Sequence, residues 1–248
     1  MSRVVAEAPG MAKAAAGESL LRDQAESCKR CPQLVASRSQ VVFGSGAVDA
    51  DLMFIGEAPG ATEDSEGVPF VGASGKLLDE LLAGIGIDRS QVYIANVLKC
   101  RPPDNRDPRS DEISNCLEYL ERQVELVAPV AIVTLGNFAT KLLRGDDTGI
   151  TEIHGQVEEC TVGARTVWLC PVFHPAAALY RRANLELLRA DFAKLPALVE
   201  RGAPEQASLS PSREPHREDA KPVVIDAAPA SHAPQGTDAD GKPQLDLF

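Results

Sequence analysis

Short apolar runs alternate with amphipathic segments along the middle of the chain. Each apolar run ends at a glycine or a polar residue, which is typical of a strand buried on both faces. The predicted strands are 51–56, 91–99, 129–136 and the second arm of a hairpin that spans 155–174. The segments between them carry leucines at helical spacing, or a capping serine with acids in the first turn. The predicted helices are 18–31, 74–84, 110–127, 137–145 and a long closing helix at 177–200.

This alternation of strands and helices predicts an α/β fold with a mostly parallel four-stranded sheet and helices on both faces. Ligands of such sheets bind at the carboxyl ends of the strands. The residues expected there are Glu57 and the acidic loop that follows it, Asn96, Gly136, Asn137 and His174. One crevice can collect all of them, although this architecture alone names no function.

The segment 55–72, IGEAPGATEDSEGVPFVG, is rich in glycine and also holds four acidic residues. Glycine-rich loops after strands usually bind phosphate, which carboxylates would repel. The sequence GASGK at 72–76 does not form a P-loop, because Leu77 follows the lysine where serine or threonine is required. The glycines of 56–67 also have the wrong intervals for a dinucleotide-binding fingerprint. The ligand of this loop has to be identified from other features.

The composition of the chain changes near residue 202. Residues 202–248 contain seven of the 18 prolines, eight acidic and four basic residues, and a single aromatic residue. Such a segment buries too little apolar surface to offset its ordering entropy, so a disordered tail is predicted. The expected organisation is a flexible N-terminus at 1–19, a folded domain at 20–201 and the tail at 202–248.

Charge and hydropathy restrict the partners. The sequence has no run of 18 apolar residues and no apolar signal-peptide core, which predicts a cytoplasmic protein without a membrane span. The net charge of −11 argues against a nucleic-acid partner. Lys99, Arg101, Arg106 and Arg109 nevertheless lie close together in the sequence and allow a local basic surface. The acidity weakens a DNA-binding hypothesis without excluding it.

Four of the six cysteines are spaced like metal ligands. They are the CxxC pair Cys28 and Cys31, and Cys100 and Cys116, which 15 residues separate. Two pairs of thiolates complete a tetrahedral set for either zinc or an iron–sulfur cluster. The alternative is that all four are buried small apolar residues, which is the interpretation we favour for Cys160 and Cys170.

Three motifs in order, together with these four cysteines, resemble the family-4 uracil-DNA glycosylases, the iron–sulfur-containing bacterial and archaeal branch. The motifs are GEAPG and PFVG within 56–72, YIANVLKCRPP at 93–103 and HPAAAL at 174–179. The resemblance spans 20–200 and implies an α/β/α sandwich with a 4Fe–4S cluster on the four cysteines, zinc being the alternative. It also implies hydrolysis of the bond between uracil and deoxyribose, which leaves an abasic site and starts base excision repair.

The resemblance assigns roles to three residues that would contact the base. Phe70 resembles the ring on which an extruded uracil stacks. Asn96 resembles the residue that reads the base, because its amide can donate to uracil O4 and accept from N3–H, the reverse of what cytosine requires. His174 resembles the histidine that donates to uracil O2 as negative charge grows on the leaving base. Core packing and strand capping are the alternative roles.

The same resemblance explains the acidic loop. The sugar becomes positively charged as uracil leaves, so carboxylates beside it stabilise the cation or orient water, while glycines let the DNA backbone approach. Glu57 and Glu63 are the candidates, and Glu63 is preferred for specificity or catalysis, since it can also brace Asn96 or exclude thymine. Ala58 and Gly60 stand where a related branch has a water-activating aspartate and a thymine-excluding tyrosine. Which carboxylate activates water is left open.

Further residues are expected to contact DNA. Leu179 resembles the wedge that fills the gap left by the extruded nucleotide, with Arg181 or Arg182 near phosphate. Ala176 stands where such families usually have serine, so one phosphate contact is expected to be missing or replaced. The other candidates are Ser74 and Lys76 at a helix start and Arg101 near the cysteines.

The chain ends in QLDLF, which resembles the peptide that bacterial replication and repair proteins use to bind the sliding clamp. The residues concerned are Gln244, Leu245, Leu247 and Phe248. Two apolar anchors on a flexible tether suit binding in a hydrophobic cleft.

The sequence therefore favours a monomeric, monofunctional uracil-DNA glycosylase in the cytoplasm, associated with the nucleoid. No lysine is evident as a Schiff-base nucleophile, so no strand cleavage is expected. Two alternatives remain: a protein that binds uracil-containing DNA without turnover, and an iron–sulfur redox protein. Release of free uracil from a uracil-containing oligonucleotide distinguishes the enzyme from the binding protein, and the redox protein would require reduction of the cluster at a physiological potential.

Overall fold

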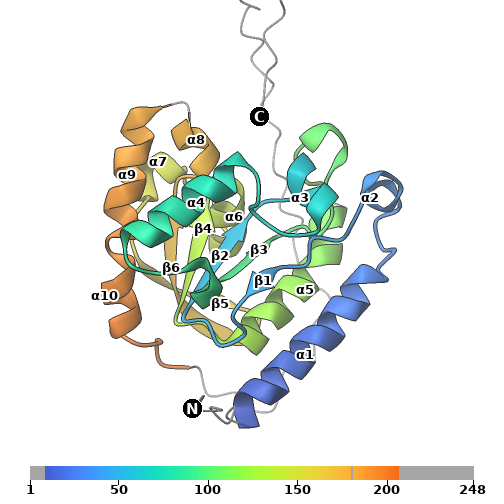
Figure 1. Cartoon of the computed structure of the whole chain (residues 1–248), viewed down its shortest axis with the longest axis horizontal. Helices are drawn as coiled ribbons and strands as arrows, with labels where there is room; N and C mark the ends of the chain where they lie inside the picture. The colour runs from blue at the N-terminus through green and yellow to red at the C-terminus, as the bar shows by residue number, and fades with distance from the viewer. Residues whose placement is uncertain (1–8, 180, 207–248) are drawn as a thin grey trace, which may run out of the picture. The chain divides into compact units, whose positions relative to one another are not determined.

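Six strands form one sheet in the order β1-β3-β2-β4-β6-β5 in the computed structural model, which describes residues 9–179 and 181–206 (Figure 1). The strands are β1 (Ser45–Gly46), β2 (Leu52–Gly56), β3 (Tyr93–Asn96), β4 (Ala131–Leu135), β5 (Glu158–Val162) and β6 (Arg165–Val172). The four central strands run parallel, and β1 and β5 pair antiparallel at the two edges. The mostly parallel sheet is confirmed, but the predicted number of four strands is wrong. The first arm of the hairpin, β5, joins the sheet, and β1 is too short to leave an apolar pattern in the sequence.

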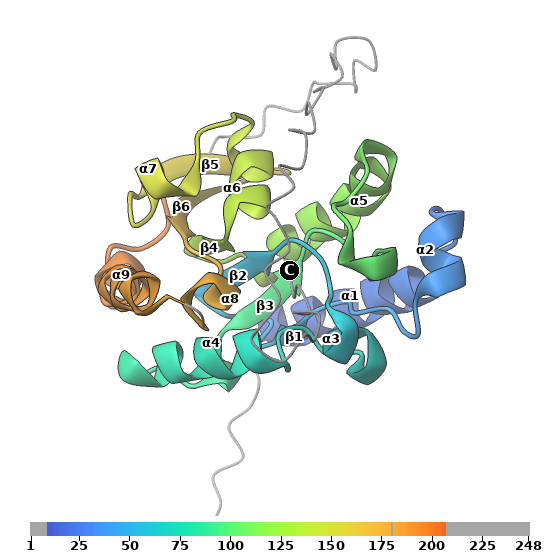
Figure 2. The ribbon, with the colours of Figure 1, turned by 90° about the horizontal axis from the view of Figure 1, so that it is seen from above.

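Helices cover both faces of the sheet, as Figure 2 shows from above. The helices are α1 (Pro9–Glu26), α2 (Pro32–Ser37), α3 (Ala61–Glu66), α4 (Ala73–Gly84), α5 (Ser110–Val127), α6 (Asn137–Arg144), α7 (Ile150–Ile153), α8 (Pro175–Leu179), α9 (Arg182–Phe192) and α10 (Leu195–Glu200), with short 3₁₀ helices η1 (Arg89–Gln91) and η2 (Pro103–Asn105). Within the described residues, no helix combines the length and the apolar character that crossing a membrane demands.

Alternate residues of each strand face opposite helical layers. Leu52 and Phe54 of β2 pack with leucines of α4 and α10 and with Phe192 of α9. Met53 and Ile55 of the same strand pack with the apolar side of α5 and with α6. Successive side chains of a strand point to opposite faces, so a strand with both sets apolar must be covered twice. The predicted three-layer α/β/α sandwich is confirmed.

The prediction of one long closing helix at 177–200 is wrong, because the chain forms the three helices α8, α9 and α10 there. Pro196 stands in the first turn of α10, where its missing amide costs no hydrogen bond. The same proline inside one long helix would remove a backbone hydrogen bond and clash with the preceding turn. The acidic loop also contains a helix that the sequence analysis leaves out, α3, which ends at Gly67 in the left-handed conformation (φ 73°).

The N-terminal boundary lies earlier than expected. Helix α1 begins at Pro9, inside the segment 1–19 that the sequence predicts to be flexible, and residues 1–8 lie outside the described part. Alanines at 12 and 14–16 favour a helix. Leu21 and Ala25 anchor it against Phe43 and against Tyr119 of α5. Packing of this apolar face explains why the helix forms so close to the chain end.

The C-terminal boundary lies later than expected. The indole of Trp168 donates to the carbonyl of Gly202 over 2.8 Å. The side-chain amide of Gln206 donates to the carbonyl of Thr166 over 2.9 Å and accepts from its amide over 3.2 Å. Residues 202–206 are therefore part of the domain, contrary to the predicted start of the tail at 202. The rest of the tail, 207–248, lies outside the described residues, and so does the QLDLF segment.

Candidate active site

The carboxyl ends of the four parallel strands meet at one edge of the sheet. Asn96 at the end of β3 pairs in register with Gly56 at the end of β2. Gly136, directly after β4, donates its amide to the carbonyl of Val172 at the end of β6 over 2.9 Å. His174 lies two residues after Val172 and packs against Gly136. A Cβ atom added to Gly136 would lie 3.1 Å from the Cβ of His174. Gly136 also has a left-handed φ of 94°, so both its backbone and its surroundings require glycine.

Phe70 lies beside Asn96 at Gly56 and also beside His174. A Cβ atom on Gly56 would overlap the side-chain oxygen of Asn96 and lie 2.7 Å from Cζ of Phe70. The rings of Phe70 and His174 have centroids 5.7 Å apart and planes inclined by 35°. The structure therefore brings the three predicted base-contacting residues to one place, although at least 25 residues lie between any two of them along the chain.

Asn96 holds a buried polar atom without a partner. Its side chain is 2 % exposed, and its Oδ1 atom accepts no hydrogen bond within the described residues. A buried acceptor without a donor costs about 1–3 kcal/mol, and such atoms are rare in folded proteins. Its backbone carbonyl, by contrast, accepts from the ammonium group of Lys99 over 2.7 Å. The main chain of Asn96 is fixed, while its side-chain oxygen is open to a donor from a ligand.

His174 is neutral at pH 7 and presents one ring N–H. The backbone amide of Ala176 donates to Nδ1 over 3.1 Å, so the ring hydrogen of the neutral form lies on Nε2. Burial lowers the pKa of His174 to about 4, against an opposing effect of the Glu63 carboxylate. Ala176, which stands where such families usually have serine, therefore orients the His174 ring through its backbone amide.

The two candidate carboxylates differ in their surroundings. Burial, together with the charge of Asp107, raises the pKa of Glu57 to about 7. One oxygen of Glu63 accepts from the backbone amides of Val71 and Gly72 over 3.1 and 2.9 Å. Glu63 thus holds the PFVG loop in place, while Glu57 stays half-buried and titrates near neutral pH.

The other members of the acidic loop have different positions. Gly60 lies beside Glu63, whose second oxygen would be 2.8 Å from a Cβ atom at this glycine. Ala58 packs against the cluster of Leu98 and the buried cysteines. Asp64 is 3 % exposed and accepts from the backbone amide of Ser39.

The four cysteines of the predicted metal site lie in one region. Cys100 and Cys116 are buried with Leu34 and Leu98, and Cys31 packs against them. Three of the sulfurs accept N–H groups. The donors are Nη1 of Arg38 to Cys100 (3.0 Å), the amide of Lys99 to Cys116 (3.4 Å) and Nδ2 of Asn115 to Cys31 (3.5 Å). N–H donors of this kind stabilise thiolates that bind a metal centre.

The charges around these sulfurs are consistent with that chemistry. Burial raises the pKa of Cys31, Cys100 and Cys116, and the charge of neighbouring thiols in the group, Cys28 among them, raises it further. The thiols of Cys31, Cys100 and Cys116 therefore resist ionisation unless a cation neutralises them. Across 9–179 and 181–206, no three histidine, cysteine or acidic side chains form the arrangement that a single metal ion needs. Cys170 is buried in the apolar core and Cys160 lies on β5.

The predicted DNA-contacting residues lie on several elements. Ser74 and Lys76 are in the first turn of α4, Leu179 ends α8 with 44 % of its surface exposed, and Arg181 is exposed before α9. Arg101 donates to the side chain of Asn105 over 2.8 Å. Lys99, which the sequence analysis groups with surface basic residues, is instead 2 % exposed. Its ammonium is bound by the carbonyl of Asn96 and by Gln123.

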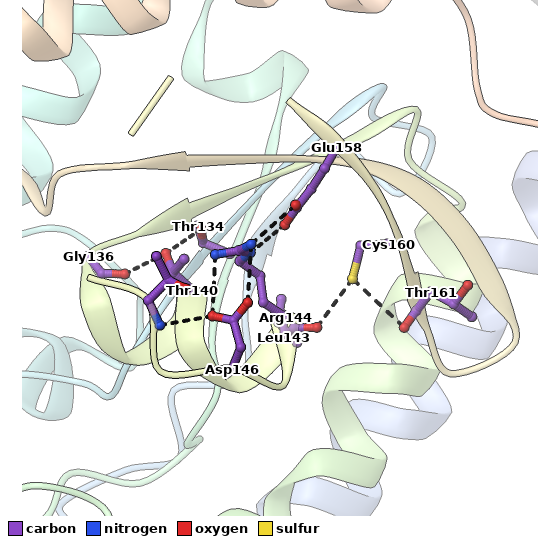
Figure 3. A network of polar contacts seen from close by, with 10 residues as sticks. Thr134, Gly136, Thr140, Leu143, Arg144, Asp146, Glu158, Cys160 and Thr161 are labelled. Carbon is purple, nitrogen blue, oxygen red and sulfur yellow. Dashed lines mark hydrogen bonds and ion pairs between the residues drawn. The ribbon is translucent and has the colours of Figure 1, made fainter. Parts of the chain in front are cut away.

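Sequence reasoning missed the residues that hold this site in shape. The hydroxyl of Thr140 donates to the carbonyl of Gly136 over 2.7 Å, and Thr134 lies 2.7 Å from Thr140 (Figure 3). Because a hydroxyl has one hydrogen, Thr134 donates to Thr140. Arg89 binds the carbonyl of Phe70. No local motif marks these residues, since their partners lie on other segments.

Comparison with known proteins supports the resemblance. The family model of the uracil DNA glycosylase superfamily matches residues 43–195. A type-4 uracil-DNA glycosylase of Sulfurisphaera tokodaii is 44% identical over 72% of this chain and 83% of its own. The type-4 enzyme of Archaeoglobus fulgidus is 44% identical over 72% of this chain and 91% of its own. A type-5 uracil-DNA glycosylase of Pyrobaculum aerophilum is 31% identical over 60% of this chain and 78% of its own. The chain therefore belongs to the uracil DNA glycosylase superfamily and, within it, to the family-4 uracil-DNA glycosylases.

Proposed function

We propose that the protein hydrolyses the N-glycosidic bond of deoxyuridine in DNA, releases uracil and leaves an abasic site. The observation that carries this proposal is the buried Oδ1 of Asn96, which has no donor within the described residues and lies near the Phe70 ring, itself paired with the ring of His174. Uracil offers the missing donor at N3–H, whereas cytosine has an acceptor there. The names of the type-4 relatives support the same activity.

Binding would place the base against these three side chains. A base inside a duplex has to be turned out of the stack before it can reach a buried pocket. The Phe70 ring offers a stacking surface, and Asn96 accepts from N3–H and donates to O4. An asparagine held in this orientation discriminates against cytosine, because cytosine would leave the Asn96 oxygen unpartnered.

Bond cleavage puts negative charge on the base and positive charge on the sugar. The Nε2–H of neutral His174 is a donor for uracil O2, and a hydrogen bond that strengthens as charge develops lowers the barrier. Glu57 is the better candidate for the water-activating group, since a carboxylate whose pKa is about 7 is an effective base at neutral pH. Glu63 acts mainly by holding the loop that carries Phe70, through Val71 and Gly72.

We also propose that Cys28, Cys31, Cys100 and Cys116 hold a 4Fe–4S cluster. Cys31, Cys100 and Cys116 lie with Leu34 and Leu98, Cys28 lies near all three, and N–H donors reach three of the four sulfurs, which fits its ligand set. The group would supply a cross-link between the N-terminal segment and the loop after β3. Absorbance at about 400 nm and equal amounts of iron and sulfide would separate it from zinc.

The proposed partners are uracil-containing DNA and, through Gln244–Phe248, a sliding clamp in the cytoplasm. Leu179, with 44 % of its surface exposed on α8, is suited to enter the gap left by the extruded nucleotide. Lys76 is exposed on α4, a helix that contacts α8, and Arg181 is exposed two residues after Leu179. Both are proposed to bind phosphate. Deletion of 244–248 should abolish clamp binding and leave uracil release unchanged.

The deciding experiment is release of free uracil from a uracil-containing oligonucleotide by the purified, iron-loaded protein. Uracil release by the wild type, and its loss in Asn96→Ala, are expected. Tight binding of the oligonucleotide without release of free uracil would overturn the assignment as an enzyme. It would favour the alternative of a protein that binds uracil-containing DNA without turnover. A thymine- or cytosine-containing oligonucleotide of the same sequence is the substrate control.

A further inference from the structure

The backbone at Phe70 adopts a conformation that a phenylalanine rarely takes. Its φ of 52° lies in the left-handed region, which favours glycine, asparagine or aspartate. Bulky residues in this region are strained, and such strain persists only where surrounding contacts hold it. The strained residue here is the one whose ring faces His174 and Asn96 across Gly56.

One arginine holds both carbonyl groups at this point. Nη1 of Arg89 donates to the carbonyl of Phe70 over 2.9 Å, and Nη2 donates to the carbonyl of Pro69 over 2.5 Å. Asp79 of α4 accepts from the same guanidinium over 2.9 Å and fixes its direction. A planar guanidinium with two N–H groups side by side is suited to hold two adjacent carbonyl groups, and an ammonium group is not.

The neighbouring helix leaves room for this arrangement. A Cβ atom on Gly75, in the first turn of α4, would overlap the carbonyl group of Phe70. That carbonyl therefore lies between the backbone of Gly75 and the guanidinium of Arg89. Both contacts hold the backbone of Phe70 and thereby the direction of the Cα–Cβ bond from which the ring extends.

We propose that Arg89 is a positioning residue for uracil recognition, acting through the backbone of Phe70 rather than by contact with DNA or base. The guanidinium stabilises the left-handed backbone, and this backbone directs the ring across Gly56 toward Asn96 and His174. The proposal rests on the proposed function for the identity of the base that stacks on the ring. Arg89 lies 19 residues after Phe70, in the short helix η1, and no catalytic or DNA-binding role was expected there.

The test is a double-mutant cycle with Phe70. Arg89→Met is measured alone and in the Phe70→Ala background for kcat, for KM on a uracil-containing oligonucleotide and for inhibition by free uracil. Alone, Arg89→Met should raise the uracil inhibition constant and KM about tenfold, with a smaller change in kcat. In Phe70→Ala, where no ring remains to be positioned, the same change should alter each constant by less than about twofold.

Two further variants control this cycle. Arg89→Lys keeps the charge but reaches only one carbonyl, so it should lie between the wild type and Arg89→Met. Arg144→Met removes another guanidinium that binds carboxylates away from the site, and it should leave the uracil inhibition constant unchanged. Equal effects of Arg89→Met in both backgrounds would overturn the proposal, because they would show that Arg89 acts independently of the ring.

A readout without substrate separates this proposal from the proposed function. Arg89→Met should shift the backbone amide resonances of Val71 and Gly72, which follow the released carbonyl, while Arg144→Met should not. If these resonances shift but the wild type releases no uracil, the enzyme assignment fails and the positioning role stands. If uracil is released and the resonances stay in place, the positioning role fails alone.

Discussion

The carboxyl edge of the sheet and the region between α6 and β5 both gather polar side chains, but their polar groups are satisfied in different ways. Between α6 and β5, Arg144 binds Glu158 over 2.5 Å and Asp146 over 3.1 Å (Figure 3). The carboxylate of Asp146 also accepts from the amide of Thr148 over 3.0 Å. These charged groups all have partners within the chain, and their arrangement needs no ligand.

At the carboxyl edge the interactions are incomplete or strained. The Oδ1 atom of Asn96 is buried without a donor in the described part of the chain, and Phe70 has a left-handed backbone. The pKa of Glu57 is raised to about 7 by burial and by Asp107. Features that cost folding free energy collect at functional sites, because there a ligand or a transition state completes them. The difference between the two regions therefore separates the residues that serve stability from those for which we propose a role in catalysis.

The largest effect is expected when Asn96, whose buried Oδ1 has no donor in the described part of the chain, is replaced. Asn96→Ala should lower kcat/KM for uracil release by about 10³-fold, since the site loses both hydrogen bonds that identify the base. The free energy of unfolding should stay the same or rise by about 1 kcal/mol, because the variant no longer buries an unpartnered oxygen. Single-turnover uracil release and urea denaturation measure the two quantities.

Gln123 offers the matched control, because it is also a fully buried amide but all its groups are bonded. Its oxygen accepts from Lys99, and its nitrogen donates to Phe43 and to Tyr93. Gln123→Ala should therefore lower the free energy of unfolding by about 2–4 kcal/mol. The comparison breaks down if Asn96→Ala unfolds as easily as Gln123→Ala and still releases uracil at the wild-type rate.

The second prediction concerns the four cysteines. Cys100→Ser should lose iron and lower Tm by roughly 10 °C, since metal binding contributes to folding. Cys170→Ala, in the apolar core, is the control: it should keep the full iron content and cost about 1 kcal/mol of stability. Iron and sulfide analysis with thermal unfolding checks both, and retention of iron by Cys100→Ser would contradict the ligand assignment.

The third prediction concerns pH. Because the pKa of Glu57 is raised from 4.5 to about 7, its carboxylate is lost as pH falls through 7, and kcat should drop roughly tenfold per pH unit below that point. Glu57→Gln should be slower and should lack this dependence between pH 5 and 8. His174, whose pKa is about 4, adds no change in that range.

The stability of the fold should fall as pH rises and Glu57 ionises, whereas activity should rise. The folded protein binds the Glu57 proton more tightly than the unfolded chain, so the stabilisation is present below pH 4.5 and is lost as pH rises through 7. Glu57→Gln should therefore be more stable than the wild type at pH 8. Asp107→Asn should move the activity change to lower pH, and an unmoved change would assign it to another group.

The smallest effect is expected in the region between α6 and β5, where the charged groups have partners within the chain. Arg144→Met should change kcat/KM by less than about twofold and lower the free energy of unfolding by roughly 1 kcal/mol, because its ion pairs are partly exposed. Steady-state kinetics and denaturation measure both. A large loss of uracil release at unchanged stability would remove the distinction between the two regions.

The sequence by itself determined the four central strands, the helices between them at 74–84, 110–127 and 137–145, the three-layer class and the family. Apolar runs such as 51–56 and 129–136 are local patterns, and burial on two faces follows from them without knowledge of any partner segment. The motifs around Glu57, Asn96 and His174 could also be found, because each lies at the end of a predicted strand. The ends of the domain were misplaced at both termini, since contacts such as Gln206 with Thr166 join segments 40 residues apart.

Only the tertiary structure decided how these residues are held. The left-handed backbone of Phe70 depends on Arg89 and Gly75, and the open acceptor of Asn96 depends on the burial that the surrounding layers create. Lys99 looked like a surface base in the sequence and is buried against Asn96. Hydrogen bonding, pKa and strain depend on which atoms approach from distant segments, and periodicity along a chain carries no information about that approach.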